Sequence, residues 1–164
     1  MKNLIIYVHG KGGSAGEAEY YKMFFPNSEV IGFDYRSQTL WEAKKEFLAF
    51  FTAQRSRFEH VTLVANSIGA FFGLSSLDET LVDRAYLISP IVDMEKLICN
   101  MMQWSGVTEQ ELALTSIETV SAFAKLHHAD LTVIPGGEHW FHTDEQMQFL
   151  DKWIRERSLN DVCG

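Results

Sequence analysis

Short runs of apolar residues recur along the chain, separated by longer segments with a helical pattern. The runs are rich in β-branched residues and lack the polar alternation of a half-exposed strand, so each predicts a strand buried on both faces, as in a parallel sheet. They occupy residues 4–8, 30–33, 61–65, 85–88 and 131–134.

The intervening segments carry helix-start signals, in which a hydroxyl residue is followed three positions later by Glu or Gln, as in a capping box. The pairs are Ser14 with Glu17, Thr39 with Glu42, Thr115 with Glu118, and Thr143 with Gln146. Apolar residues at helical spacing follow two of these starts, at Leu40, Ala43, Phe47 and Phe50, and at Met147, Leu150 and Ile154. Alternating strands and amphipathic helices predict an α/β fold, a doubly wound and mainly parallel sheet with helices on both faces. Ligands of such folds bind beyond the carboxyl ends of the strands.

The size and composition of the chain fit one globular domain over residues 1–164. Its 164 residues are 46% hydrophobic and 22% charged, which is ordinary for a protein with a full core. The two cysteines, Cys99 and Cys163, lack the spacing of a disulfide framework, so we expect free thiols. The sequence leaves the oligomeric state open.

The charge balance excludes several classes of partner. A formal net charge of −8 repels phosphate backbones and anionic lipids, so we expect neither a nucleic acid nor a membrane as partner. No apolar run reaches the ~20 residues of a membrane helix. The apolar run at the start of the chain is shorter than that of a signal peptide and has the pattern of a strand, so we expect a cytoplasmic protein.

The clearest chemical signal follows the third predicted strand. There Ala65-Asn66-Ser67-Ile68-Gly69 joins the strand directly to a helical run. Small residues two positions before and after a serine allow a tight strand-to-helix turn that exposes the hydroxyl beside a helix N-terminus. Ser67 is therefore the candidate nucleophile; the alternative is an ordinary capping serine in a βα turn.

A histidine follows the last predicted strand, in the loop Gly136-Gly137-Glu138-His139-Trp140. A histidine in a glycine-rich loop beyond a strand end suits a general base for a serine, and the order Ser before His fits this chemistry. His142 forms a His-x-x-His pair with His139. No third ligand is evident, so we expect no metal.

A glycine-rich loop also follows the first predicted strand, as His9-Gly10-Lys11-Gly12-Gly13-Ser14. Glycines let the chain turn tightly and present backbone N–H groups, as an oxyanion hole requires. The alternative is a dinucleotide fingerprint formed by Gly10, Gly12 and Ala15, with Asp34 placed about 20 residues later to bind a ribose. That alternative leaves Ser67 and His139 unexplained.

Together, the strand leading to His9-Gly10, the Ser67 turn and the His139 loop resemble the small bacterial α/β-hydrolases along nearly the whole chain. The resemblance implies Ser67 as nucleophile, His139 as base, and an oxyanion hole from the backbone N–H groups of Ile68 and Lys11. It places His9, Gly10 and Gly12 beside the substrate. It also implies hydrolysis of a small-molecule acyl substrate, such as a carboxylic ester, without metal or organic cofactor.

The sequence departs from this family where the acid of the triad is expected. Between Pro90 and Ala129 we predict helices at 94–103 and 117–125 but no strand, and one βα unit of about 30 residues is missing near residues 113–114. A natural deletion and a segment omitted from this sequence both fit; we favour the omission. Asp93 is the remaining candidate acid, and its alternative is a helix N-terminal aspartate.

Two further expectations follow. We expect residues 93–114 to form a helical cap over the active site. Such a cap would shape the substrate pocket, so the sequence does not reveal the substrate specificity. A hydrolase-fold protein that binds a ligand without turning it over also stays open as an alternative function.

Overall fold

The computed structural model describes residues 2–92, 117–137, 141 and 143–159. The chain divides into two compact units, one made of residues 1–90 and 151–164 and the other of residues 91–150. The predicted cap at residues 93–114, the two cysteines and the junction at residues 113–114 lie outside the described residues.

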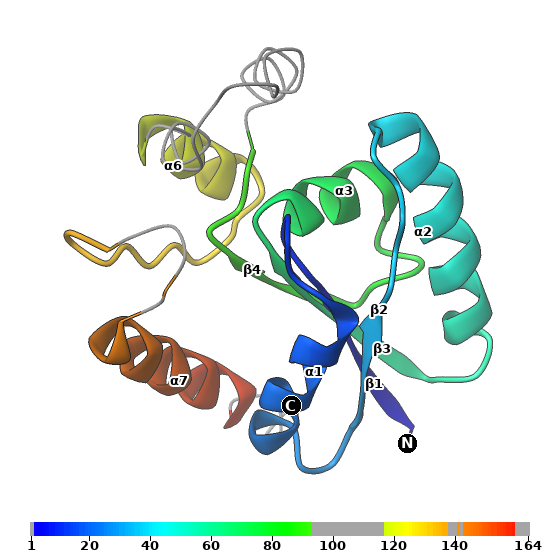
Figure 1. Ribbon diagram of the computed structural model, residues 1–164, viewed down its shortest axis with the longest axis horizontal. Coiled ribbons are helices and arrows are strands. Elements are labelled where there is room, and N and C mark those ends of the chain that lie inside the picture. The colour runs from blue at the N-terminus through cyan, green and yellow to red at the C-terminus, as the bar shows by residue number, and fades with distance from the viewer. Residues whose placement is uncertain (1, 93–116, 138–140, 142, 160–164) are drawn as a thin grey trace. The chain divides into compact units, whose positions relative to one another are not determined.

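The first unit is built on a four-stranded sheet whose described strands are all parallel. The strands are β1 (Asn3–Val8), β2 (Glu29–Phe33), β3 (His60–Asn66) and β4 (Arg84–Ile88), in the spatial order β2-β1-β3-β4 (Figure 1). Ile5 lies opposite Val30 on one side and Thr62 on the other. Four of the five predicted strands and the α/β class are confirmed. Because β1 and β3 are the inner strands, their carboxyl ends meet at the middle of one edge of the sheet.

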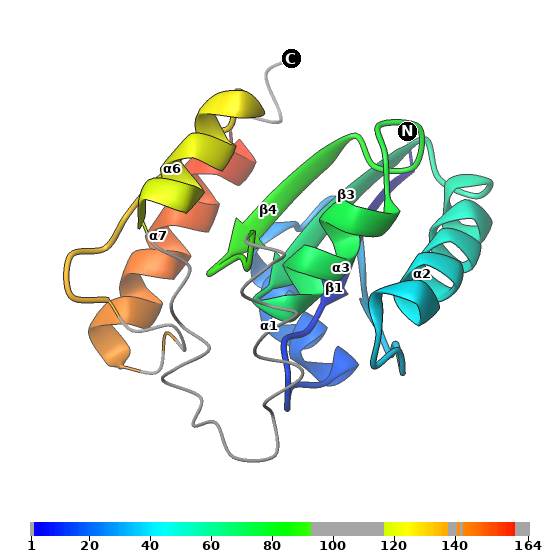
Figure 2. The same cartoon turned by 90° about the horizontal axis from the view of Figure 1, so that it is seen from above.

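Two helices pack on one face of this sheet: α2 (Leu40–Arg55) and α3 (Ile68–Ser76), which lie beside each other (Figures 1 and 2). The predicted capping box at Thr39 is present, since the Glu42 N–H donates to Thr39 Oγ1 at 3.3 Å and the Thr39 N–H donates to Glu42 Oε2 at 3.1 Å. Phe47 is fully buried and lies 6.1 Å from Phe72 of α3, measured between ring centroids. The buried face of α2 ends with Phe51, whereas the sequence predicted that Phe50 would belong to it.

The other face carries three short elements, η1 (Ala15–Glu17), α1 (Ala18–Tyr21) and η2 (Lys22–Phe24). Tyr21 stacks on Tyr7 of β1 with ring centroids 4.8 Å apart. Helix α7 (Asp144–Leu159) contributes its C-terminal part, where Arg155 lies over the Phe24 ring at 5.0 Å and Trp153 meets Tyr86 edge to face at 6.0 Å. The sheet therefore has helices on both faces, as predicted.

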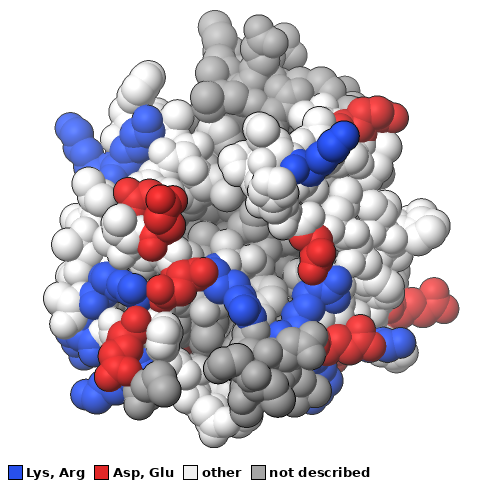
Figure 3. Space-filling view, turned by 180° about the vertical axis from the view of Figure 1, so that it is seen from behind, with Lys and Arg blue, Asp and Glu red and all other residues white. Residues whose placement is uncertain are grey.

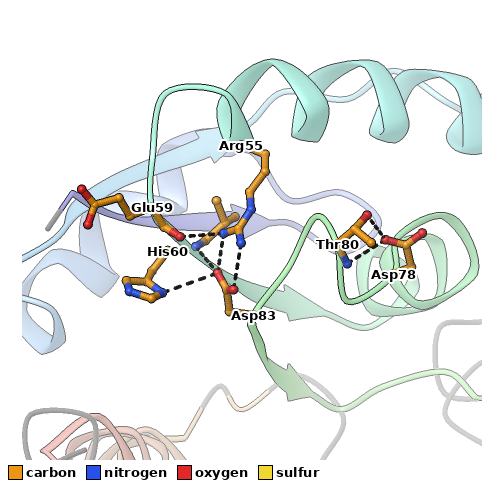
Figure 4. A network of polar contacts seen from close by, with 7 residues as sticks. Arg55, Glu59, His60, Asp78, Thr80 and Asp83 are labelled. Atoms are coloured by element: carbon orange, nitrogen blue, oxygen red, sulfur yellow. Dashed lines mark hydrogen bonds and ion pairs between the residues drawn. The ribbon is translucent and has the colours of Figure 1, made fainter.

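Asp83 immediately precedes β4 and ties the start of this strand to the start of β3 and to the end of α2 (Figure 4). Its carboxylate accepts two hydrogen bonds from the Arg55 guanidinium, at 2.6 and 3.0 Å, and one from the Val61 N–H at 2.8 Å. Burial opposes ionisation of Asp83, but the bonds from Val61 and Arg55 outweigh it and hold the pKa of this carboxyl below its usual range. One side chain thus fixes the end of α2 and the starts of β3 and β4.

In the second unit, α6 (Ile117–Leu126) confirms the helix predicted at 117–125. The strand predicted at residues 131–134 is wrong, because this segment forms none of the strands of the described sheet. Its side chains Leu131 and Val133 are 42% and 51% exposed. A segment forms a strand only where a neighbouring strand bonds to its backbone, and an apolar sequence does not by itself provide that neighbour.

The surface carries charges of both signs. Lys and Arg are interspersed with Asp and Glu over the face shown in Figure 3. Within the described part of the chain, no helix is long and apolar enough to cross a membrane.

Candidate active site

Ser67 occupies the turn between β3 and α3 in a left-handed backbone conformation. Its φ is +52° and its ψ is −118°, values that a non-glycine residue adopts only when its surroundings enforce them. Its N–H donates to the Ile88 carbonyl at 3.0 Å, which extends the bonding between β3 and β4 past the last strand residues, and its carbonyl accepts from the Ala70 N–H at 3.1 Å. The strained strand-to-helix turn predicted from the sequence is therefore present, but Ser67 is only 8% exposed, whereas the sequence predicted an exposed hydroxyl.

Two glycines allow the backbone to close around this serine. A Cβ on Gly69 would lie 2.4 Å from the His9 carbonyl oxygen and 2.9 Å from that of Val8, so α3 can start against the end of β1 only with glycine here. A Cβ on Gly10 would lie 3.2 Å from the Ser67 Cβ. The glycine loop after β1 and the serine turn after β3 are thus in direct contact.

The glycine loop is held in a defined shape. The Gly13 N–H donates to the Gly10 carbonyl at 3.2 Å, and Gly12 has a φ of +76°. The His9 ring stacks on Tyr35 with centroids 4.4 Å apart, and the Tyr35 hydroxyl donates to the His9 carbonyl at 2.9 Å. Burial, and then the charge of Glu46, raises the pKa of Tyr35 to about 12.

The structure therefore brings together part of the predicted site. Ser67, Ile68 as the first residue of α3, and the loop containing Gly10 and Lys11 share one edge of the sheet. The first N–H groups of a helix have no partners within the helix, and the dipole favours negative charge there. Such an edge can stabilise an oxyanion that forms beside the serine.

The other predicted residues are not described. His139, His142 and the candidate acid Asp93 lie outside the described residues, so their roles remain predictions. In the ranges that the structure does describe, no three His, Cys, Asp or Glu side chains group as metal ligands would.

The dinucleotide alternative finds little support in the local structure. After the glycine loop come the three-residue η1 and the four-residue α1, in place of the long helix whose N-terminus would hold a pyrophosphate. The Ala15 carbonyl packs directly against β2, where a Cβ on Gly32 would lie 1.9 Å from its oxygen. Asp34 is exposed.

Three residues beside the site were missed by sequence reasoning: Tyr7, Tyr35 and, as more than a capping residue, Glu17. Tyr7 is buried, and its hydroxyl donates to Glu17 Oε2 at 2.5 Å. Burial, and then this bond to Glu17, raises the pKa of Tyr7 well above its usual range. For Tyr7, the sequence offered one signal: its hydroxyl is a polar group within the apolar run at residues 4–8, two residues before His9.

Comparison with known proteins finds similar folds but no similar sequence family. No family model and no curated protein matches the sequence. Among solved structures, a predicted CIB-like hydrolase from Thermoplasma acidophilum superposes with a TM-score of 0.66 at 13% identity, over 95% of this chain and 86% of that one. An uncharacterized protein from Bacillus cereus ATCC 10987 superposes with a TM-score of 0.64 at 15% identity, over 94% of this chain. The chain spans 60% of the length of the Bacillus cereus protein. The fold is thus one that a predicted hydrolase shares.

Proposed function

We propose that the protein is a serine hydrolase that cleaves small carboxylic esters or related acyl compounds through an acyl-enzyme on Ser67. The observation that carries the proposal is the backbone of Ser67, at φ +52° between a buried strand and a helix start. Strain of this kind costs of order 1–3 kcal/mol, persists only where the surrounding structure enforces it, and is concentrated at active sites. The shared fold of a predicted hydrolase supports the same class of reaction.

In the proposed mechanism the Ser67 hydroxyl attacks the acyl carbonyl while His139 takes its proton. The carbonyl π electrons move to the oxygen, and the N–H groups of Ile68 and Lys11 stabilise the resulting oxyanion. The oxyanion then re-forms the carbonyl, the bond to the alkoxide breaks, and His139 gives its proton to this leaving group, which yields an alcohol and the acyl-enzyme. A water molecule next gives a proton to His139 and attacks the acyl carbon. When this second intermediate collapses, the bond to Ser67 Oγ breaks and His139 returns the proton to Oγ, which releases the carboxylic acid and regenerates Ser67.

The acid beside His139 decides how fast this cycle runs. A carboxylate fixes the imidazole tautomer and stabilises the imidazolium, and loss of that partner in a related triad lowers kcat about 10⁴-fold. Asp93 is the candidate that the given sequence offers for this role. With Asp93 as acid, Asp93→Asn reduces turnover toward that residual level.

Hydrolysis of a chromogenic ester such as p-nitrophenyl acetate tests the proposal. We expect one equivalent of nitrophenol per protein as the acyl-enzyme forms, followed by steady turnover, and neither phase in Ser67→Ala. The matched control is Ser37→Ala, because Ser37 is another buried serine but lies in the loop between β2 and α2 and bonds to Glu46. Equal hydrolysis by the wild type and Ser67→Ala would overturn the proposal. So would ligand binding without any acyl-enzyme, which is what a non-catalytic binding protein would show.

A further inference from the structure

The carboxylate of Glu17 bonds at the same time to the glycine loop and to the sheet beneath it. Its Oε1 accepts the Ser14 N–H at 2.8 Å, at the end of the loop that begins at His9. Its Oε2 accepts the Tyr7 hydroxyl at 2.5 Å, from inside β1. The same carboxylate lies against the loop backbone, since a Cβ on Gly13 would meet Oε1 at 2.7 Å. One side chain therefore ties the loop to a buried strand residue.

Tyr7 continues this connection to the serine turn. The Asn66 side chain acts on the same Tyr7 hydroxyl and lowers its pKa, against the effects of burial and Glu17, and Asn66 immediately precedes Ser67. Asn66 also lies against the loop, because a Cβ on Gly10 would be 3.6 Å from the Asn66 carbonyl oxygen and 3.8 Å from its Cγ. The Tyr7 ring is 1% exposed and stacked on Tyr21, so its hydroxyl is held in one place.

We propose that Tyr7 and Glu17 are positioning residues, which set the distance between the N–H groups of the loop and the Ser67 hydroxyl by bonding to both segments from beneath. The inference rests on the proposed function, because that distance matters only if an oxyanion forms between the two. Neither residue touches the reacting atoms. An oxyanion hole works through donors fixed in advance, and a displacement of about 1 Å can cost 10²-fold in rate.

The chemistry of the link requires both a carboxylate and a phenol. The two oxygens of Glu17 accept from two different donors. Glutamine has the same shape but one oxygen and one NH₂ group, so in Glu17→Gln the Ser14 N–H keeps its acceptor only if the NH₂ group faces Tyr7, whose hydroxyl must then accept this bond and lose the carboxylate to which it donates. Tyr7→Phe keeps the buried ring and removes only the hydroxyl.

The rate of reaction with a fluorophosphonate probe tests the inference. The Ser67 oxygen displaces fluoride from phosphorus, and the phosphoryl oxygen occupies the oxyanion site, so the limiting rate constant reports on the loop donors. We expect Tyr7→Phe and Glu17→Gln to lower this rate constant about 10- to 100-fold while the concentration for half-maximal rate stays nearly unchanged. A purely structural role would lower the melting temperature and leave the limiting rate constant of the folded protein unchanged.

Tyr20→Phe is the matched control. The Tyr20 hydroxyl also bonds to a carboxylate, that of Asp151, but the pair joins α1 to α7 and contacts neither the loop nor the serine turn. We expect a similar loss of melting temperature and an unchanged labelling rate. Equal labelling rates in Tyr7→Phe, Glu17→Gln and the wild type would overturn the inference and leave the proposed function standing. A wild-type protein that is not labelled at Ser67 would remove both.

Discussion

At the residue scale, two backbone positions determine the candidate site. Ser67 is held at positive φ, and Gly69 permits α3 to start against the carbonyl groups of Val8 and His9. The pattern of small residues around Ser67 predicted this turn because the motif is short and contiguous, although the contact that requires Gly69 is with the distant end of β1. The bond between Tyr7 and Glu17 was not predictable, since it depends on how β1 and η1 pack.

Gly69→Ala tests the close approach. Its Cβ would meet backbone oxygens, which cannot move without shifting β1 or α3, so we expect the free energy of unfolding to fall by about 1–3 kcal/mol. Urea denaturation measures this loss. The control is Gly73→Ala in the same helix, where the new Cβ would meet only the end of the Leu63 side chain at 3.0 Å and alanine favours the helix. A Gly69→Ala protein as stable as Gly73→Ala would contradict the role given to Gly69.

At the element scale, capping boxes and apolar runs predicted most of the described helices and strands, because both signals reflect local hydrogen bonding and burial. Thr39 and Glu42 cap α2 as expected. The strand predicted at residues 131–134 does not form, because a strand also needs a neighbouring strand to bond its backbone. The sequence of the segment does not show whether such a neighbour is available.

The bonds of Asp83 to Arg55 and Val61 join α2, β3 and β4, and their contribution to stability depends on pH. Because the folded pKa of Asp83 is lowered, its ionised form stabilises the fold above the unfolded pKa of about 3.9, and this contribution is lost as the pH falls through the lower, folded value. We expect Asp83→Asn to lower the free energy of unfolding by about 1 kcal/mol at pH 7, a figure reduced for partial exposure. The difference from the wild type should shrink below pH 4.

Urea denaturation at pH 7 and at pH 3 measures this effect. Glu19→Gln is the control, since the ion pair of Glu19 with Lys22 is exposed and should contribute nothing measurable. A deficit in Asp83→Asn that stays constant between the two pH values would show that charge is not the cause.

At the scale of the whole molecule, the alternation of strands and helices predicted a parallel α/β sheet with its candidate chemistry at the carboxyl ends of the strands. The four described strands and the superposition on a predicted hydrolase bear out the fold. The sequence did not reveal which carboxylate completes the site. That choice depends on chain segments far apart in sequence, and Asp93 and His139 are both outside the described residues.

The central claim is that Ser67 is a nucleophile, and site mapping of a fluorophosphonate adduct on the intact protein tests it most directly. We expect one adduct per chain, located by peptide mass on Ser67 and absent from Ser67→Ala, with labelling retained in Ser37→Ala. An adduct on another residue, labelling that persists in Ser67→Ala, or no adduct on the folded wild-type protein would contradict it.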